Sequence, residues 1–413
     1  MIWLLIGYMF LFIHRPFEIW PELGEIRLER MYMLLILFSA LISGRLQPRA
    51  NLMHAAIAAM LVAVIASWLF SPWAGSELAQ KTVFDWLKTV VFYVLAVSLC
   101  RDRREFTLLV IGLVAATGLY VTHSVYEYQL GRRQFSMGVR RLIGINITLK
   151  HPNSFAAVAL ITMPFAFFLF RHAETKLIRA GAAIYVLIAT YGTLLTSSRM
   201  GFVGIIFLVF MLWLRSRHKV RMFLALLVIS AVVWPLLGES KQNRILSLYD
   251  SSYAPANAKV SADGRKESFW DGMALFQRFP LTGCGPGGWQ PATGKGTSSH
   301  NLYGQVPGEL GAAGVLGFVF LVGLALMQSW QLWRWPQNAR EITKADAEFW
   351  SDTGVMFMRV VLIMLLFGLA GGSLFRYYWI WTAALIAVAR PVFVDEWMMA
   401  AARPGDPEED PGR

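Results

Sequence analysis

The chain has 413 residues, of which 56% are hydrophobic and only 15% are charged. A soluble domain carries roughly a quarter charged residues, so this composition excludes a water-soluble globule and indicates a polytopic membrane protein. Because the cations behind the net charge of +12 separate apolar segments, they indicate membrane topology and an anionic lipid or substrate, and no nucleic-acid partner is expected.

The membrane-spanning segments are expected to begin at the N-terminus. Residues 2–13 are apolar and have neither a basic region before them nor a cleavage site, so they should remain as a first span. Since a helix needs about 20 mostly apolar residues to cross the hydrocarbon, about twelve spans are expected. The sequence therefore predicts an all-α fold with a single integral membrane domain over residues 1–413. The twelve segments are 1–14, 29–44, 52–70, 84–100, 106–123, 154–170, 178–196, 200–214, 222–238, 308–330, 354–370 and 376–392.

The connectors between these segments predict the orientation. Successive connectors lie on alternate sides of the membrane and so form two sets. In one set the cations lie in short loops, such as 101–104 and 215–221. In the other set most cations fall in two long segments, 123–153 and 239–307. Because short loops set the orientation, the first set, both termini and a polar tail at 393–413 are expected in the cytoplasm. The cations of the two long outer segments are not needed for topology, so an anionic ligand is the simplest reason for them.

Ionisable residues within the spans open an alternative. Asp85 and Lys88 are three residues apart and could pair, and Arg359 lies in the eleventh segment. Such groups are typical of transporters, so a lipid or polysaccharide transporter or flippase is a possible function. They are few, however, and the chain shows no internal repeat, which disfavours transport.

The first outer segment and the connector near 196–201 supply candidate binding groups. Four histidines can reach the outer face, and four arginines of the segment 123–153 form a cationic group. In KHPNS, His151 is expected to set the turn before Pro152, with a catalytic role as the second interpretation. Arg199, in LLTSSRMGF, must lie at the membrane surface, where it could snorkel or bind phosphate through two parallel hydrogen bonds. The histidines are His14, His123, His151 and His300, and the arginines are Arg132, Arg133, Arg140 and Arg141.

The segment 239–307 is expected to be a long periplasmic loop with its own helix. Phe269, Met273 and Phe276 share one helical face, which predicts a helix lying on the membrane, with Arg265 and Lys266 at its start. The following FPLTGCGPGGWQ predicts a tight turn, and a phosphate-binding glycine loop is disfavoured because no GK[ST] follows. Cys284 in this turn and Cys100 fall on opposite faces, so no disulfide is expected.

The next span begins in SSHNLYGQVPGELGAAGVLGF. Pro307 is expected in its first turn, which places His300 just outside the bilayer. Histidine is a natural general base near neutral pH, although at a membrane boundary it is more often a hydrogen-bonded surface residue. Glycines at 308, 311, 314 and 317 favour close helix packing over contact with a lipid tail.

Three features now occur in order: SSRMGF, then GRKESFW followed by FPLTGCGPGGW, then SSHNLYGQVPGELGAAGVLGF. Together, over about residues 190–330, they resemble the O-antigen ligase and O-antigen polymerase family of bacterial membrane glycosyltransferases. That family often has His-x-His-Asn, and Ser298 replaces the first histidine here, whereas His300 aligns with the second.

The resemblance implies a GT-C-like helical fold in the bacterial inner membrane and glycan transfer from an undecaprenyl-pyrophosphate-linked donor on the periplasmic face. The acceptor hydroxyl would belong to a lipid A-core sugar in a ligase, to another repeat unit in a polymerase, or to a protein Ser or Thr in related members. The resemblance also implies that His300 acts as the base or orients the acceptor, and that Arg199 and Arg265 bind pyrophosphate. Further candidates are Arg140, Arg141, Lys266, Asn301 and Glu309.

The same chemistry can be argued from the residues. Guanidinium groups stabilise the charge that builds on a leaving pyrophosphate, and His300 could accept the acceptor's proton in a single inverting attack. A metal-dependent transferase would have an outer-face Asp-x-Asp or Glu-x-Asp, and the only match, Glu408-x-Asp410, lies in the C-terminal tail. Neither a metal nor a cofactor is therefore expected.

Overall fold

The computed structural model describes residues 1–25, 27–136, 139–236, 238–246 and 256–402, and helices dominate these ranges. Within them, eight helical segments are long and apolar enough to cross a membrane. The chain is thus an all-α polytopic membrane protein, as the composition predicts. The first segment combines α1 (Ile2–His14) and α2 (Pro16–Ile19), and the others are α6 (Glu77–Leu99), α7 (Arg103–Gln129), α8 (Pro152–His172), α9 (Lys176–Leu195), α15 (Leu302–Asn338), α16 (Lys344–Gly368) and α17 (Tyr377–Ala401).

The other four predicted spans also form helices, but these are shorter. They have 15, 17, 17 and 18 residues, which is close to the lower limit of about 17 for a span. A total of twelve spans therefore remains a prediction. These helices are α4 (Leu28–Ile42), α5 (Met53–Leu69), α10 (Arg199–Arg215) and α11 (Lys219–Leu236).

Several helix ends differ from those expected. α7 continues past the predicted end at His123 to Gln129, into the expected outer segment, and α17 continues to Ala401, into the predicted polar tail. The rest of that tail, 403–413, lies outside the described residues. Polar side chains are compatible with helix, so a helix can continue after its apolar run has ended. The remaining outer segment forms a hairpin of β1 (Arg133–Ser136) and antiparallel β2 (Val139–Leu142).

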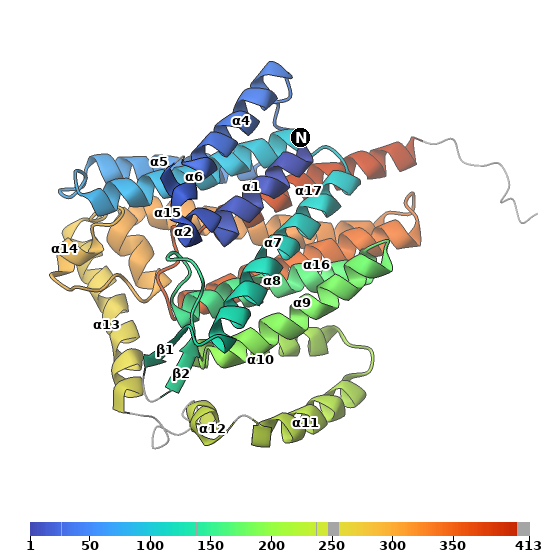
Figure 1. The fold of residues 1–413 in the computed structure, drawn as a ribbon. Helices are drawn as coiled ribbons and strands as arrows, with labels where there is room; N and C mark the ends of the chain where they lie inside the picture. Colours follow the sequence, from blue (N-terminus) through green and yellow to red (C-terminus); the bar gives the residue numbers. More distant parts are fainter. Residues whose placement is uncertain (26, 137–138, 237, 247–255, 403–413) are drawn as a thin grey trace, which may run out of the picture.

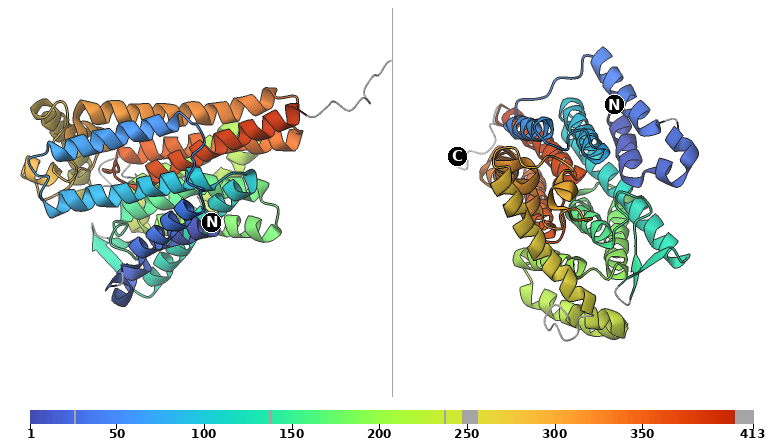
Figure 2. Two further views of the ribbon diagram at one scale, coloured as in Figure 1. Left: turned by 90° about the horizontal axis from the view of Figure 1, so that it is seen from above. Right: turned by 90° about the vertical axis from the view of Figure 1, so that its left-hand side faces the viewer.

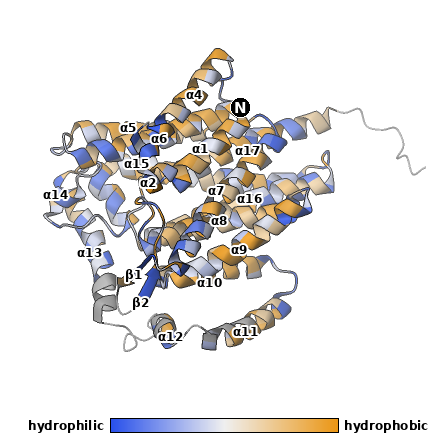
Figure 3. Ribbon diagram, in the orientation of Figure 1, coloured by the Kyte–Doolittle hydropathy of each residue, from blue (hydrophilic) through white to orange (hydrophobic). Residues whose placement is uncertain are grey.

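The long helices run roughly parallel, and α13 (Ala256–Arg278) crosses one end of the bundle, together with α14 (Trp289–Thr293) and the hairpin (Figure 1). An end-on view shows α13 lying across that face (Figure 2). We call this the α13 end of the bundle. Apolar residues cover the lengths of the long helices, and polar residues gather at their ends (Figure 3). The short α3 (Pro21–Glu25) and α12 (Glu239–Leu246) complete the described helices.

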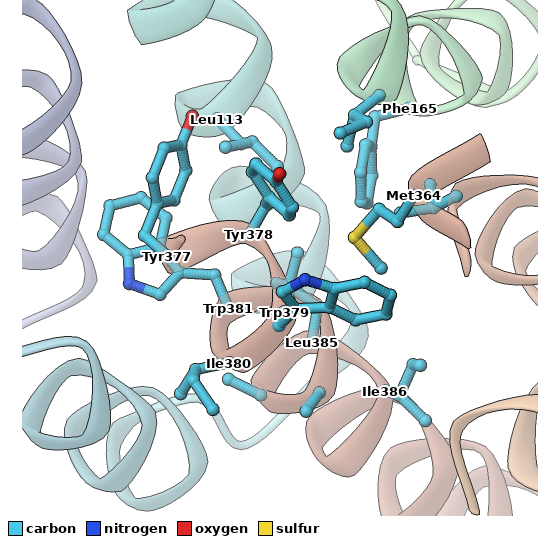
Figure 4. Close-up of a cluster of buried hydrophobic side chains, with 14 of the residues drawn as sticks. Leu113, Phe165, Met364, Tyr377, Tyr378, Trp379, Ile380, Trp381, Leu385 and Ile386 are labelled. Carbon is cyan, nitrogen blue, oxygen red and sulfur yellow. The ribbon is translucent and has the colours of Figure 1, made fainter. Parts of the chain in front are cut away.

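The centre of the bundle is α17. Its residues Tyr377, Tyr378, Trp379 and Trp381 gather with side chains from α7, α8 and α16 (Figure 4), and all four are buried. The Trp381 ring also stacks on a ring of α6, with centroids 4.1 Å apart. A helix that is apolar on all sides is stable only when it is enclosed, so α17 forms the core and its first residues reach the α13 end.

The start of α15 corrects one prediction. The helix begins at Leu302, so Pro307 is its sixth residue and does not lie in the first turn. The earlier start has a local cause: the side-chain oxygen of Asn301 accepts hydrogen bonds from the N–H groups of Tyr303 (2.9 Å) and Gly304 (3.4 Å). This N-cap satisfies two of the backbone donors that a helix start leaves free.

The glycines of α15 pack closely, as predicted. A β-carbon at Gly308 would lie 3.1 Å from the Cα of Gly272, and one at Gly317 would lie 3.2 Å from a methionine sulfur of α5. Gly311 has φ 62° and ψ −157°, and the helix kinks there against the backbone near Leu281. The kink turns the first part of α15 toward α13.

Candidate active site

Four helices begin near one another at the α13 end. Their N-caps are His151 for α8, Ser198 for α10, Asn301 for α15 and Arg376 for α17. Hydrogen bonds connect these starts. Ser198 Oγ donates to Asn153 Oδ1 (2.7 Å), and Arg376 Nη1 donates to the carbonyl oxygen of Thr148, in the segment before α8 (2.8 Å). Each helix start carries partial positive charge, so this arrangement favours an anion even before side chains are considered.

The segment that carries His300 is held from two sides. On one side, the His300 N–H donates to Ser268 Oγ of α13 (3.3 Å), and the Asn301 side chain donates to the backbone oxygen of Arg265 (3.5 Å). On the other side, the N–H of Gly372 donates to the carbonyl oxygen of Ser299 (3.1 Å). The His300 residue itself remains partly exposed, so the backbone is anchored while the imidazole stays accessible to a substrate.

Electrostatic effects show that the predicted residues lie together. Partial burial and the Arg265 guanidinium lower the pKa of His300. Burial and the charge of Arg199 lower the pKa of Arg265. The structure thus brings His300, Arg265 and Arg199 into one neighbourhood. At neutral pH the lowered pKa keeps the His300 imidazole in the neutral form, which can accept a proton.

His151 belongs to the same neighbourhood. Burial lowers its pKa to about 4, and Arg141, His300 and Arg376 act in the same direction. Its Nδ1 accepts a hydrogen bond from the Asn153 N–H (3.2 Å). This confirms the predicted role of His151 in setting the turn before Pro152, and it places the ring beside the cationic cluster.

Two carboxylates on the same helix as Arg265 bind another cation. Glu267 and Asp271 of α13 both bind Lys295 Nζ, at 2.7 and 2.6 Å. In the part of the chain that the structure describes, neither Arg265 nor Arg376 forms an ion pair. Two guanidinium ions without a carboxylate partner among these residues, close to helix N-termini, are suited to binding a multiply charged anion.

The other cationic candidates differ in their surroundings. Arg141 is only 5% exposed, and its guanidinium donates to the carbonyl oxygen of Thr196 (2.8 Å) and to Asn153 Oδ1 (3.4 Å). It therefore joins the hairpin to the start of α10. Arg140, its neighbour on β2, and Lys266 are both exposed. They add positive charge to the surface, and within the described ranges no side-chain hydrogen bond or ion pair joins them to the cluster.

Glu309 holds the glycine turn. Its carboxylate accepts hydrogen bonds from the Gly287 N–H (3.3 Å) and from Gln305 Nε2 (3.2 Å), and its backbone oxygen accepts one from the Gly285 N–H (3.0 Å). Gly283, Gly285 and Gly287 all have positive φ, which confirms a tight turn. The turn connects α13 to α15, so Glu309 contributes to the site by holding these two helices in place. Cys284 in this turn and Cys100 at the far end of α6 are both free thiols.

Two further histidines expected at this face pair with each other. His14 Nε2 and His123 Nδ1 are 3.0 Å apart, and their rings stack. Among the residues that the structure describes, no three or more His, Cys, Asp or Glu side chains are grouped so that they could hold a metal ion.

Three contributors to the site were not predicted as such from the sequence. Arg376 lies in a short connector, and nothing in the local sequence relates it to α8. Ser268 lies three residues after Arg265 in GRKESFW, and that spacing places both on one helical face. Asn153 lies in the HPNS segment noted above, where its side chain joins Ser198 and Arg141.

An apolar cavity of about 340 Å³ lies between α13 and α15. It is lined in part by Met273 and Phe276 of the predicted interfacial face, and by Tyr303 and Pro307. Because Tyr303 follows the Asn301 cap by two residues, the cavity begins within one helical turn of His300. The site thus has a charged part and an apolar part side by side.

One comparison with known proteins found a family model that matches part of the chain. Residues 183–322 match a family model described as O-Antigen ligase. The match includes Arg199, Arg265 and His300, whereas Arg141, His151 and Arg376 lie outside it. It confirms the resemblance drawn from the motifs over about the same residues. No curated protein matches the chain.

Proposed function

We propose, since residues 183–322 belong to the O-antigen ligase family, that this membrane protein transfers a glycan from undecaprenyl pyrophosphate to an acceptor hydroxyl. The family supports a membrane glycosyltransferase-like ligase or polymerase. We assign the lipid A-core sugar as the acceptor. A polymerase, which would use another repeat unit, and a protein O-glycosylation ligase share the same donor chemistry and are the alternatives.

One observation carries the proposal: the cationic cluster of Arg199, Arg265 and Arg376 lies at the same end of the bundle as an apolar cavity of about 340 Å³ between α13 and α15. A polyprenyl pyrophosphate has the same two parts, a multiply charged headgroup and a hydrocarbon chain. Guanidinium groups bind phosphate oxygens through paired hydrogen bonds, and the apolar walls between α13 and α15 can hold the first isoprene units.

The proposed reaction is a single displacement. The acceptor oxygen attacks the anomeric carbon while the bond from that carbon to the pyrophosphate oxygen breaks, which inverts the anomeric centre. His300 takes the acceptor's proton, and Arg199 and Arg265 stabilise the negative charge that develops on the leaving pyrophosphate. Because these fixed cations supply the charge stabilisation, the proposed reaction is metal-independent.

We assign the α13 end to the periplasmic side of the bacterial inner membrane, with both termini in the cytoplasm. Short loops rich in arginine lie at the opposite end of the bundle, including the one between Leu99 and Arg103. The positive-inside rule places such loops in the cytoplasm. A lipid-linked glycan on the outer leaflet would then approach α13 from the plane of the membrane.

The direct test uses purified full-length protein and a purified lipid-linked glycan donor. His300→Ala should abolish transfer, and His218→Ala, which changes an exposed histidine in the loop between α10 and α11, should not. Equal transfer by both variants would remove His300 from the mechanism. A flippase would give no transfer product even with the wild-type chain.

The acceptor is tested in a deletion strain whose surface glycans are separated by size. Loss of all long lipopolysaccharide, with normal polymer left on the carrier, indicates a ligase. A single repeat unit left on the core indicates a polymerase. Intact lipopolysaccharide together with an unglycosylated protein would indicate protein O-glycosylation.

A further inference from the structure

A second cavity, which is polar, lies at the end of the bundle opposite α13. It has a volume of about 990 Å³ and lies where α8, α10 and α15 end and α16 begins. This volume is at the upper end of the range of about 300–1,000 Å³ for small-molecule sites. α8 has 21 residues and reaches from one site to the other, so about 30 Å separates them. The cavity is therefore distinct from the candidate active site.

The charges that line this cavity are mainly positive. Two of its described lining residues, Glu348 and Asp352, are acidic. Five are cationic: Arg171, Arg215, Arg217, Lys344 and Arg359. Asp352 already binds Arg171 Nη1 and His172 Nε2, both at 2.8 Å. The two acidic side chains cannot balance the five cations, so the cavity has an excess of positive charge.

Arg359 is the deepest of these cations. It lies fifteen residues after Lys344, so it is about 22 Å further along α16. Its Nη2 donates to the backbone oxygen of Met211 (3.3 Å), and within the described ranges it forms no ion pair. An ionisable side chain at this depth of an apolar helix is costly unless it serves a bound ligand or a path through the membrane.

Apolar side chains also line the cavity. Phe167, Phe168 and Met356 line the cavity together with Arg359. A site with a cationic interior and apolar walls is suited to a phosphate group, which guanidinium ions bind bidentately. We propose that this cavity binds a phosphate-bearing anion, with Arg359 as its innermost ligand. The phosphate can belong to the headgroup of an anionic membrane lipid or to a soluble phosphate.

The test measures ligand binding to the full-length protein in a neutral detergent. Phosphatidylglycerol, phosphatidylcholine and inorganic phosphate are titrated separately, and binding is followed by native mass spectrometry and by the shift in Tm. We expect saturable binding of phosphatidylglycerol or of phosphate, and an affinity weakened about tenfold or more in Arg359→Gln. Arg340→Gln removes an exposed cation at the same end that does not line the cavity, and it should change the affinity less than twofold.

Competition distinguishes the two sources of phosphate. Phosphatidylglycerol binding that inorganic phosphate does not displace indicates a lipid headgroup, and displacement indicates a soluble phosphate. The proposal is overturned if neither ligand binds saturably, if phosphatidylcholine binds equally well, or if Arg359→Gln and Arg340→Gln bind alike. Should Arg359→Gln fail to fold, Arg215→Gln replaces it under the same criteria.

Discussion

Gly272 of α13 and Gly304 of α15 touch backbone to backbone. A β-carbon at Gly272 would lie 2.1 Å from the carbonyl oxygen of Gly304, and one at Gly304 would lie 2.5 Å from the carbonyl oxygen of Ser268. This contact lets Ser268 accept the hydrogen bond from the His300 N–H. The placement of the proposed base relative to α13 thus depends on two glycines, because only a hydrogen atom fits where a larger side chain would begin.

Gly272→Ala should separate α13 from α15. Because the added methyl group meets backbone and not a mobile side chain, we expect a loss of stability of about 1–3 kcal/mol and a large loss of transfer activity. The matched control is Gly264→Ala in the same helix, where a β-carbon meets nothing within 4 Å. Thermal unfolding in detergent and initial rates of transfer provide the measurements. Equal behaviour of the two variants would contradict the proposed contact.

The pH dependence of transfer should reflect His300. Burial and Arg265 lower its pKa, so the neutral base persists below the ordinary value of about 6.5. As pH falls through the lowered pKa, the imidazole is protonated and kcat/KM should decrease. A bound pyrophosphate would favour the protonated form, so the acid limb of kcat should lie at higher pH than that of kcat/KM. Both limbs are measured with the lipid-linked donor.

A variant tests the assignment of that acid limb. His300→Gln should abolish most activity, and any residual activity should no longer follow the same limb. If the limb persists unchanged, another group controls it. His151, whose pKa is lowered to about 4, is then the first candidate, and His151→Gln would move or remove the limb.

Arg265→Lys should impair transfer although it keeps the charge. A lysine ammonium cannot form two parallel hydrogen bonds to a phosphate, so we expect kcat/KM to fall about tenfold or more. Lys266→Gln is the control, because it removes a cation from the adjacent exposed position and should retain nearly full activity. If Arg265→Lys is as active as the wild type, Arg265 contributes only general positive charge. Rates are measured at two salt concentrations to separate these contributions.

Asn301 is predicted to act mainly through the helix that it caps. Asn301→Ala removes the acceptor for the Tyr303 and Gly304 N–H groups, which should cost about 1 kcal/mol of stability. Asn301→Ser restores a capping oxygen and should recover most of the stability. If its activity also recovers, Asn301 is a positioning residue. A stable but inactive Asn301→Ser would instead indicate a direct contact between the amide and the substrate.

Much of this architecture could be predicted from the sequence because its signals are local. The apolar runs predicted the long helices, and the spacing of Phe269, Met273 and Phe276 predicted a helix that the structure extends to Ala256–Arg278. The motifs around Arg199, Arg265 and His300 predicted the family. The early start of α15 was missed although its signal was present, since Asn301 is a preferred N-cap residue.

The composition and local motifs of the chain predict a helical membrane protein that resembles the O-antigen ligase family. Only the tertiary structure decides that Arg376 and His151 join Arg265 and His300, and that the Glu309 carboxylate holds a glycine turn. The physical reason is the distance along the chain over which each interaction acts. Hydropathy and helix capping act over a few neighbouring residues, whereas the meeting of α8, α10, α15 and α17 depends on side-chain packing between segments far apart in the chain.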